Sequence, residues 1–442
     1  RIFFNARFYY PIFTILFLDF GLTLEQFAIL NAVWAATIVL LEVPSGALAD
    51  TVGRRNLVIA SSVIMIVEMA LLCLAPIGQM PIVVYFFLIN RILSGAAEAS
   101  ASGADEALAY DTLKDLGLER SWGKVLETQM RFQSIAFIVA MSVGALLYDA
   151  EHLNQIFTAL SFDIKVSKAF AIRIPLILTL LLGIGALVTA LGLKEPNSEK
   201  VTRRKARQED WFATIKEAFA KTQDTGKWIL NTPVAMMIIL GGFLIDHIAR
   251  MILTLNSEYY RRIELPEASF GIIGAVFGLM GLFTPRLGRW LSEKKTKTFN
   301  FSLIGILTFF GLLGMTNFVP YWGVLPMIFI YGPIGLTRFL VSAYMNAETP
   351  SSGRATALSF KGLFYNLAYG GIGLIYSLLV YKLRRTESMQ ANPAEHVDAE
   401  LFKSALSYFP SYFSVAFVLV LLFGIINRHS IDTSPLKKDD ST

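Results

Sequence analysis

Apolar segments dominate the chain, and short polar stretches separate them. Runs of about 20 apolar residues, the length that a helix needs to cross about 30 Å of hydrocarbon, recur along the whole sequence. Two of the runs, 81–112 and 232–260, exceed this length and must tilt or protrude. We predict twelve membrane-spanning helices, at 2–20, 24–49, 57–75, 81–112, 127–148, 169–193, 232–260, 268–291, 299–318, 321–347, 354–382 and 403–427.

A long polar stretch, 194–230, separates six of these spans from the other six. It is basic, and its second half has a helical pattern in which Trp211 and Phe219 share a face. We expect that helix to lie in the membrane interface, within a linker that has no regulatory site. The sequence therefore predicts an all-α polytopic membrane protein: a lobe at 1–193, the linker, and a second lobe with a cytoplasmic tail at 231–442.

Composition supports a membrane protein. Hydrophobic residues make up 54% of the chain and charged residues 17%, whereas soluble domains average about 25% charged residues. The single cysteine, Cys73, excludes an intramolecular disulfide and does not indicate a redox compartment. The sequence begins at Arg1 inside an apolar run, without the features of a signal peptide. It also lacks an initiator Met, so we expect a short N-terminal stretch to precede it.

The distribution of Lys and Arg predicts the orientation. About 24 of the 39 cations lie in alternate loops and the tail, and about 8 lie in the opposite loops. Loops rich in Lys and Arg face the cytoplasm, so we expect both termini there. The net charge of +5 then reflects topology and lipid contact, and it does not indicate nucleic acid binding. The cation-rich segments are 50–56, 113–126, 194–231, 286–298, 348–361 and the tail after Asn427.

The polar junction between the second and third spans carries a distinctive motif. Gly46 has no side chain, so two backbones can approach closely there, and Asp50 closes the apolar run. Gly53 then turns the chain, and Arg54 and Arg55 place two cations at the start of the next span. We interpret Asp50 as a latch, because a carboxylate at a helix junction accepts hydrogen bonds from a helix N-terminus or an arginine.

This junction resembles the signature loop between helices 2 and 3 of major facilitator superfamily transporters. The family pattern is Gly-x-Leu-Ala-Asp-x-x-Gly-Arg-Arg/Lys, and the matching residues here are Gly46, Leu48, Ala49, Asp50, Gly53, Arg54 and Arg55. The resemblance implies two six-helix lobes that rock about a central site, with the latch on the cytoplasmic side. It also implies a transporter that is complete as a monomer.

The fourth span also resembles the family, through its motif Arg-x-x-x-Gly at Arg91 and Gly95. In the family this arginine is associated with proton coupling, so the resemblance implies that role for Arg91. The loop 348–359 resembles the corresponding loop of bacterial efflux-like members. These likenesses imply a location in the bacterial inner membrane.

Arg91, Glu98 and Asp105 are spaced by seven residues, so they fall on one helical stripe. An ionisable group inside a span is costly unless it faces water or a partner, which gives two readings. In the first, the stripe lines a cavity and Glu98 carries a proton. In the second, the charges form structural ion pairs, with Arg91 bonded to Glu98 or to a neighbouring helix.

Other charges lie on the first, seventh and tenth spans, and in the family these helices join the fourth in lining the central cavity. Asp246 pairs either with Arg338 or, one turn away, with Arg250; the second pairing leaves Arg338 for an anionic group. His247 is either titratable near neutral pH or a hydrogen-bonded packing residue. The expected cavity residues are Arg7, Arg91, Glu98, Asp105, Asp246, His247, Arg250 and Arg338. Glu68 is an exception, because the sequence offers it no good partner.

The sequence contains no arrangement of residues that is typical of an enzyme active site. A phosphate-cradling Gly-x-x-x-x-Gly-Lys-Ser/Thr motif is missing, and so is a His/Cys cluster with metal-ligand spacing. We therefore expect no cofactor and no metal, and a gradient as the energy source.

Three functions remain open. The first is proton-coupled transport of a small organic solute, with export favoured. The fifth span lacks the proline of the drug-antiporter motif at 142–145, which counts against multidrug antiport. The second is import of a nutrient or siderophore by proton symport. The third is a sensor that keeps the fold without transporting.

Overall fold

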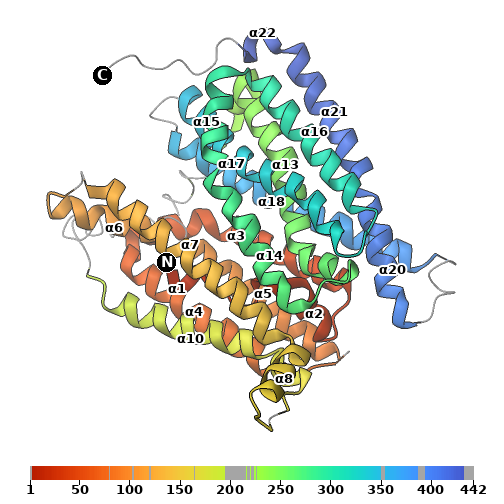
Figure 1. Cartoon of the computed structure of the whole chain (residues 1–442). Helices are drawn as coiled ribbons and strands as arrows, with labels where there is room; N and C mark the ends of the chain where they lie inside the picture. Colours follow the sequence, from red (N-terminus) through yellow and green to blue (C-terminus); the bar gives the residue numbers. More distant parts are fainter. Residues whose placement is uncertain are drawn as a thin grey trace. The chain divides into compact units, whose positions relative to one another are not determined.

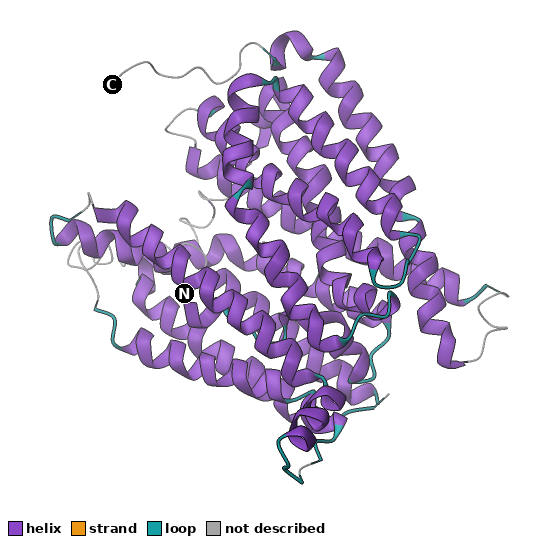
Figure 2. Ribbon diagram, viewed as in Figure 1, coloured by secondary structure: helices purple, strands orange, loops and turns teal. Residues whose placement is uncertain are grey.

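The computed structural model describes residues 2–78, 80–101, 104–118, 121–163, 165–194, 216, 220, 223–224, 226–349, 354–386 and 394–432. Within these residues all regular structure is helical, and no strand is present (Figure 2). Eleven helical segments in the described part of the chain are long and apolar enough to cross a membrane. The chain divides into a first unit, 1–219 with 266–275, and a second unit, 220–265 with 276–442.

The helices of the first unit follow the predicted spans closely (Figure 1). They are α1 (Ile2–Asn5), η1 (Tyr10–Ile12), α2 (Phe13–Asp19), α3 (Leu24–Val52), α4 (Arg54–Leu74), α5 (Pro81–Ala101), α6 (Ala104–Asp115), α7 (Trp122–Tyr148), α8 (Ala150–Ala159), α9 (Lys168–Ala171) and α10 (Ile174–Leu191). Helix α5 packs against α3 and α4, and α4 packs against α10.

In the second unit, the 30-residue helix α13 packs against α16, α17, α18 and α21. From residue 233 onward the helices are α13 (Pro233–Arg262), η3 (Glu267–Ser269), α14 (Phe270–Leu279), η4 (Met280–Leu282), α15 (Thr284–Lys294), α16 (Lys297–Met315), η5 (Trp322–Met327), α17 (Ile328–Glu348), α18 (Arg354–Arg384), α20 (Ala394–Ser407), α21 (Phe409–Ile426) and α22 (Arg428–Ile431). Of these, η3 and the start of α14 belong to the first unit. The division between the units falls within α14.

The first predicted span, 2–20, is not one continuous helix. It consists of α1, η1 and α2, with an irregular stretch after Asn5. Pro11 contributes to this break, because proline has no N–H to donate to the preceding turn. Irregular backbone at membrane depth is tolerated where other groups satisfy it, and here the N–H of Phe8 donates to Oγ1 of Thr179 on α10, at 3.1 Å.

Close backbone approaches hold the first unit together. A Cβ added at Gly144 on α7 would lie 1.8 Å from the carbonyl oxygen of Phe8, so only glycine fits against the broken span. A Cβ at Gly95 on α5 would lie 2.9 Å from the carbonyl oxygen of Trp34 on α3. Small residues at such positions let membrane helices pack at short range.

Candidate functional site

The signature motif lies in a helical segment rather than in the polar loop that the sequence indicates. Helix α3 continues through Pro44 to Val52, and Gly53 alone forms the turn to α4. Gly53 has φ 98° and ψ 141°, a conformation open to glycine but strained for other residues. The surroundings of Gly46 and the side chain of Asp50 lie outside the described residues, so the latch stays a prediction.

The two arginines of the motif connect α4 to two other helices. Arg54 forms an ion pair with Asp111 of α6. Arg55 donates from Nε to the carbonyl oxygen of Leu193 at 2.7 Å and from Nη2 to that of Leu191 at 3.0 Å. A cation at the C-terminal end of a helix stabilises its unsatisfied carbonyl groups. The motif therefore ties the start of α4 to α6 and to the end of α10.

Arg7 and Glu68 form a buried ion pair that the sequence did not reveal. Nη1 of Arg7 lies 2.6 Å from Oε1 of Glu68, and the two side chains are 3% and 0% exposed. The same nitrogen donates to the hydroxyl of Tyr9 at 3.0 Å, and Asn90 donates to the backbone oxygen of Glu68 at 3.1 Å. The break in the first span brings Arg7 to α4, and periodicity alone does not indicate this break.

Arg91 lies in the interior of the first unit, in contact with α3. Its Nη2 donates to Oδ1 of Asn31 at 3.0 Å, and its guanidinium carbon lies 5.2 Å from the ring centroid of Trp34 and 5.4 Å from that of Phe13. A guanidinium at this range is attracted to the negative face of an aromatic ring. Arg91 therefore bonds a neighbouring helix, which is one of the partners the sequence left open.

Glu98 and Asp105 line a common cavity of about 690 Å³, whereas Arg91 is not among its lining residues. Glu98 lies in the last described turn of α5 and is exposed, and Asp105 lies on α6. Lys194 is the one basic residue among the described residues of the wall. The remaining polar lining consists of Asn5, Ser61, Ser62, Thr112, Gln129 and Thr189.

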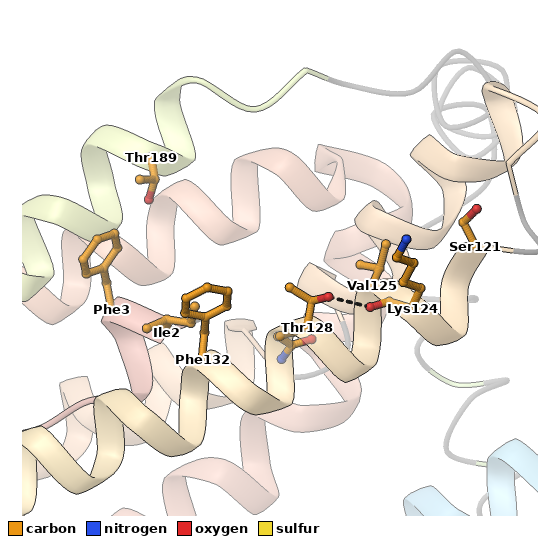
Figure 3. Close-up of a pocket in the computed structure, with 9 residues that line it drawn as sticks. Ile2, Phe3, Ser121, Lys124, Val125, Thr128, Phe132 and Thr189 are labelled. Atoms are coloured by element: carbon orange, nitrogen blue, oxygen red, sulfur yellow. Dashed lines mark hydrogen bonds between the residues drawn. The ribbon is translucent and has the colours of Figure 1, made fainter.

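A second, largely apolar hollow of about 620 Å³ lies beside this cavity and shares Val125, Gln129 and Thr189 with it. Figure 3 shows Phe3 of α1 and Phe132 of α7 at its wall. Thr128, also in the wall, uses its hydroxyl to bond the backbone oxygen of Lys124 at 2.8 Å. This hollow has fewer groups that recognise a polar solute than the cavity at Glu98.

In the second unit Asp246 pairs with Arg250 on α13, with Oδ2 2.9 Å from Nε. Neither of these two atoms makes a hydrogen bond with a described residue, so the contact is an ion pair whose geometry does not suit a hydrogen bond. Arg250 also donates to Oδ1 of Asn366 at 3.1 Å and to the backbone oxygen of Tyr365 at 2.9 Å. Its guanidinium carbon lies 4.7 Å from the ring centroid of Tyr369. These contacts fix Arg250 between α13 and α18.

His247 and Arg338 have different surroundings. His247 is 2% exposed, and its Nε2 lies 2.9 Å from the hydroxyl of Tyr412 while Nδ1 lies 2.5 Å from the backbone oxygen of Phe243. Both ring nitrogens thus have partners, as in the packing interpretation. Arg338 on α17 is exposed.

Among the described residues no group of three or more His, Cys, Asp or Glu is placed to hold a metal ion.

Lys361 on α18 was missing from the sequence-based set. It lies within electrostatic range of Asp246 and Arg338, and its Nζ lies 6.0 Å from the ring centroid of Tyr365. The sequence analysis counted Lys361 in the cation-rich segment 348–361 and also within the predicted span 354–382, and α18 includes it as a helical residue. The signal in the sequence was that Lys361 and Tyr365 are four positions apart, which places their side chains on the same face of a helix.

Comparisons with known proteins give a consistent result. A family model described as Major Facilitator Superfamily matches residues 2–373, and no protein of curated function matches the chain.

Three solved structures with a similar fold are structures of transporters. The nucleoside transporter NupG aligns with TM-score 0.68 and 13% identity, over 96% of each chain. A bacterial homologue of the human lysosomal transporter Spinster, inward-facing and occupied, aligns with TM-score 0.68 and 14% identity, over 99% of this chain and 96% of that one. The xylose transporter XylE from E. coli, inward open, aligns with TM-score 0.60 and 14% identity, over 100% and 95%. At these identities the likeness shows a shared fold.

Proposed function

Because the chain belongs to the Major Facilitator Superfamily, we propose that it is a proton-coupled secondary transporter that exports a small organic solute by alternating access. In this fold a site near the midplane is exposed to each side in turn as the lobes rock. A proton or solute shifts the equilibrium between the two states by no more than its difference in affinity for them.

The observation that carries the proposal is the cavity that Glu98 and Asp105 line together. Carboxyl groups bind and release protons, and the charges and polar groups around a carboxyl group set the free energy of its charged form. The wall has two carboxylates and one cation, Lys194. We propose Glu98 as the proton carrier and Asp105 as its neighbour in the same cavity. The outward direction rests on the likeness of the loops to efflux-like members.

We also propose that residues 1–193 and 231–442 form the two lobes, with 194–230 as a cytoplasmic linker. The protein acts as a monomer in a bacterial inner membrane, with both termini in the cytoplasm and with lipid around the spans. Asp50 acts as a conformational latch together with Gly46, Gly53, Arg54 and Arg55.

Transport in proteoliposomes tests proton coupling. A panel of small solutes is offered to the parent protein and to Glu98→Gln, with a pH gradient imposed in either orientation. We expect the parent to accumulate a solute against its gradient in one orientation and the variant to lose this accumulation. Glu151→Gln is the matched control, because Glu151 lies exposed in the first turn of α8 outside the cavity wall.

Flux that is indifferent to the pH gradient and to Glu98→Gln would reject proton coupling and leave a facilitator. The complete absence of solute-dependent flux and of solute-dependent stability would instead favour a sensor that keeps the fold.

Import by symport is the second candidate, and the cations of the second unit favour it. Arg338 of α17 and Lys361 of α18 are cations outside the ion pair of Asp246 with Arg250, which suits an anionic nutrient or siderophore that enters together with protons. Proton and solute move together in symport and in opposite directions in antiport. The orientation of the pH gradient that drives accumulation therefore separates import from export.

A further inference from the structure

We propose that the apolar hollow between α1, α7 and α10 is a binding site for an anionic phospholipid of the surrounding bilayer. An acyl chain fills the end of the hollow at Phe3 and Phe132, and the phosphate of the headgroup lies at the end formed by Ser121 and Lys124. The inference goes beyond the proposed transport function and does not depend on it, because the shape and the polarity of the hollow define the site.

The hollow lies where three helices of the first unit meet. Helix α1 packs against both α7 and α10, and the wall contains Ile2 and Phe3 of α1, Thr189 of α10 and a row of residues on α7. Its volume of about 620 Å³ lies in the range of cavities that hold small molecules. The hollow is therefore large enough for one acyl chain.

The wall changes from polar to apolar along one face of α7. Lys124, Thr128 and Phe132 are spaced by four residues, which places them on the same face of the helix. At 1.5 Å per residue, Lys124 and Phe132 are about 12 Å apart along the helix axis. Figure 3 shows Ser121 and Lys124 at one end of the hollow. Phe3 and Phe132 lie at the other end, so the two ends suit the two parts of an amphiphile.

The apolar end is open to the surroundings of the unit. Phe3, Val125 and Phe132 are all exposed, and exposed apolar patches mark sites of contact with a membrane or a protein. The hydroxyls of Thr128 and Thr189 already donate to backbone oxygens of their own helices. These side chains therefore need no polar ligand, and hydrocarbon covers this part of the wall without leaving apolar surface in water.

The polar end keeps groups that the chain itself leaves unused. The side chains of Ser121, Lys124 and Gln129 make no hydrogen bond or ion pair with another residue of the described chain. Lysine binds phosphate as a point charge, and hydroxyl and amide groups donate to phosphate oxygens. The three side chains thus supply one positive charge and two further donors for a phosphodiester headgroup.

The charge of the site favours an anionic lipid over a zwitterionic one. Lys124 is the charged residue of the described wall, which contains no carboxylate, so nothing in it offsets the attraction for a negative headgroup. A choline headgroup would bring a cation of its own next to Lys124. The sequence analysis places 113–126 among the segments that face the cytoplasm, and the leaflet on that side carries the negatively charged lipids.

The bound lipid lies beside the cavity of Glu98. Val125, Gln129 and Thr189 belong to the walls of both the hollow and the cavity. A lipid chain in the hollow therefore covers the outer side of a wall whose inner side faces the two carboxylates.

Lipid binding to the purified full chain tests the headgroup contact. Mixed micelles of detergent with phosphatidylglycerol or with phosphatidylcholine are the probes, and native mass spectrometry counts the lipids that each protein retains. We expect the parent to prefer phosphatidylglycerol and Lys124→Gln to lose about fivefold in affinity for it, the contribution of one lysine near an anionic membrane surface. Lys114→Gln is the matched control with the affinity of the parent, because Lys114 is exposed in the last turn of α6 outside the wall.

A bulky substitution tests the position of the acyl chain. Figure 3 shows Thr128 between the two ends of the hollow, so we expect the indole of Thr128→Trp to fill the space and to abolish retention of the lipid. Ile135→Trp adds the same side chain at an exposed position of α7 outside the wall and should retain it. If Thr128→Trp loses its helical circular dichroism signal, Phe132→Asn takes its place, because it makes the apolar end polar at an exposed position.

Three results would overturn the proposal. The first is equal affinity of the parent for the two lipids, which would indicate unspecific lipid contact. The second is an unchanged affinity for phosphatidylglycerol in Lys124→Gln. The third is an equal number of retained lipids in the variants at position 128 or 132 and in Ile135→Trp, which would place the lipid elsewhere on the protein.

Discussion

At the scale of single residues, the first unit contains a charge pair whose two members come from distant parts of the sequence. Arg7 and Glu68 are almost fully enclosed, and Oε2 of Glu68 makes no hydrogen bond with a described residue. The pair therefore carries the desolvation penalty of two charges and is only partly compensated. Removing one partner leaves the other charge buried, whereas removing both removes the penalty as well.

We expect Glu68→Gln to destabilise the protein by about 3–5 kcal/mol, because the cation of Arg7 then lacks its counter-ion. The double variant Arg7→Met with Glu68→Leu should regain most of this loss, since it replaces two buried charges by apolar groups. The free energy of unfolding of both variants is measured in detergent, with the loss of the helical circular dichroism signal as the readout. A double variant less stable than the single one would show that the pair adds net stability.

At the scale of helices, hydrophobic periodicity predicted the positions of the spans well, and the interruptions within them poorly. The segment 2–20 reads as a uniform apolar run, yet it breaks at Arg7, where Thr179 supplies a tertiary hydrogen bond. A local pattern gives the length and hydrophobicity of a segment, whereas a break depends on partners that lie more than a hundred residues away.

Gly144 provides a test of how tightly α7 packs against the broken span. Gly144→Ala places a methyl group 1.8 Å from the carbonyl oxygen of Phe8, so we expect a loss of about 1–3 kcal/mol, typical of overpacking. Gly371→Ala is the control, because nothing lies within 4 Å of its added Cβ. There the better helix propensity of alanine should stabilise α18 by up to about 1 kcal/mol. Melting temperatures that shift equally in both variants would contradict the close approach.

At the scale of the whole molecule, two arginine–carboxylate pairs show what the sequence could and could not suggest: Asp246 with Arg250 in the second unit, and Arg7 with Glu68 in the first. Asp246 and Arg250 are one turn apart on α13, so spacing was sufficient to suggest them. Arg7 and Glu68 are 61 positions apart, and no local spacing links them. Glu98 and Asp105 share a cavity wall, while Arg91 belongs to the interior of the unit.

The proposed latch concerns the conformational equilibrium of the entire chain. We expect Asp50→Asn to lower the initial rate of transport about tenfold, the effect of losing a charge-assisted hydrogen bond, and to leave expression unchanged. Asp163→Asn makes the same chemical change in an exposed loop and should have no effect. Transport by Asp50→Asn at the parent rate would reject the latch.

The contact of Arg55 with the end of α10 has a consequence for the chain that follows. Arg55 binds main-chain oxygens of Leu191 and Leu193, so it holds that segment whatever side chains occur there. Substitutions at these two positions should be tolerated, whereas loss of Arg55 releases two carbonyl groups at once. This contact therefore fixes the position of the end of α10 relative to the start of α4. The proposed linker then begins at a fixed point, Lys194.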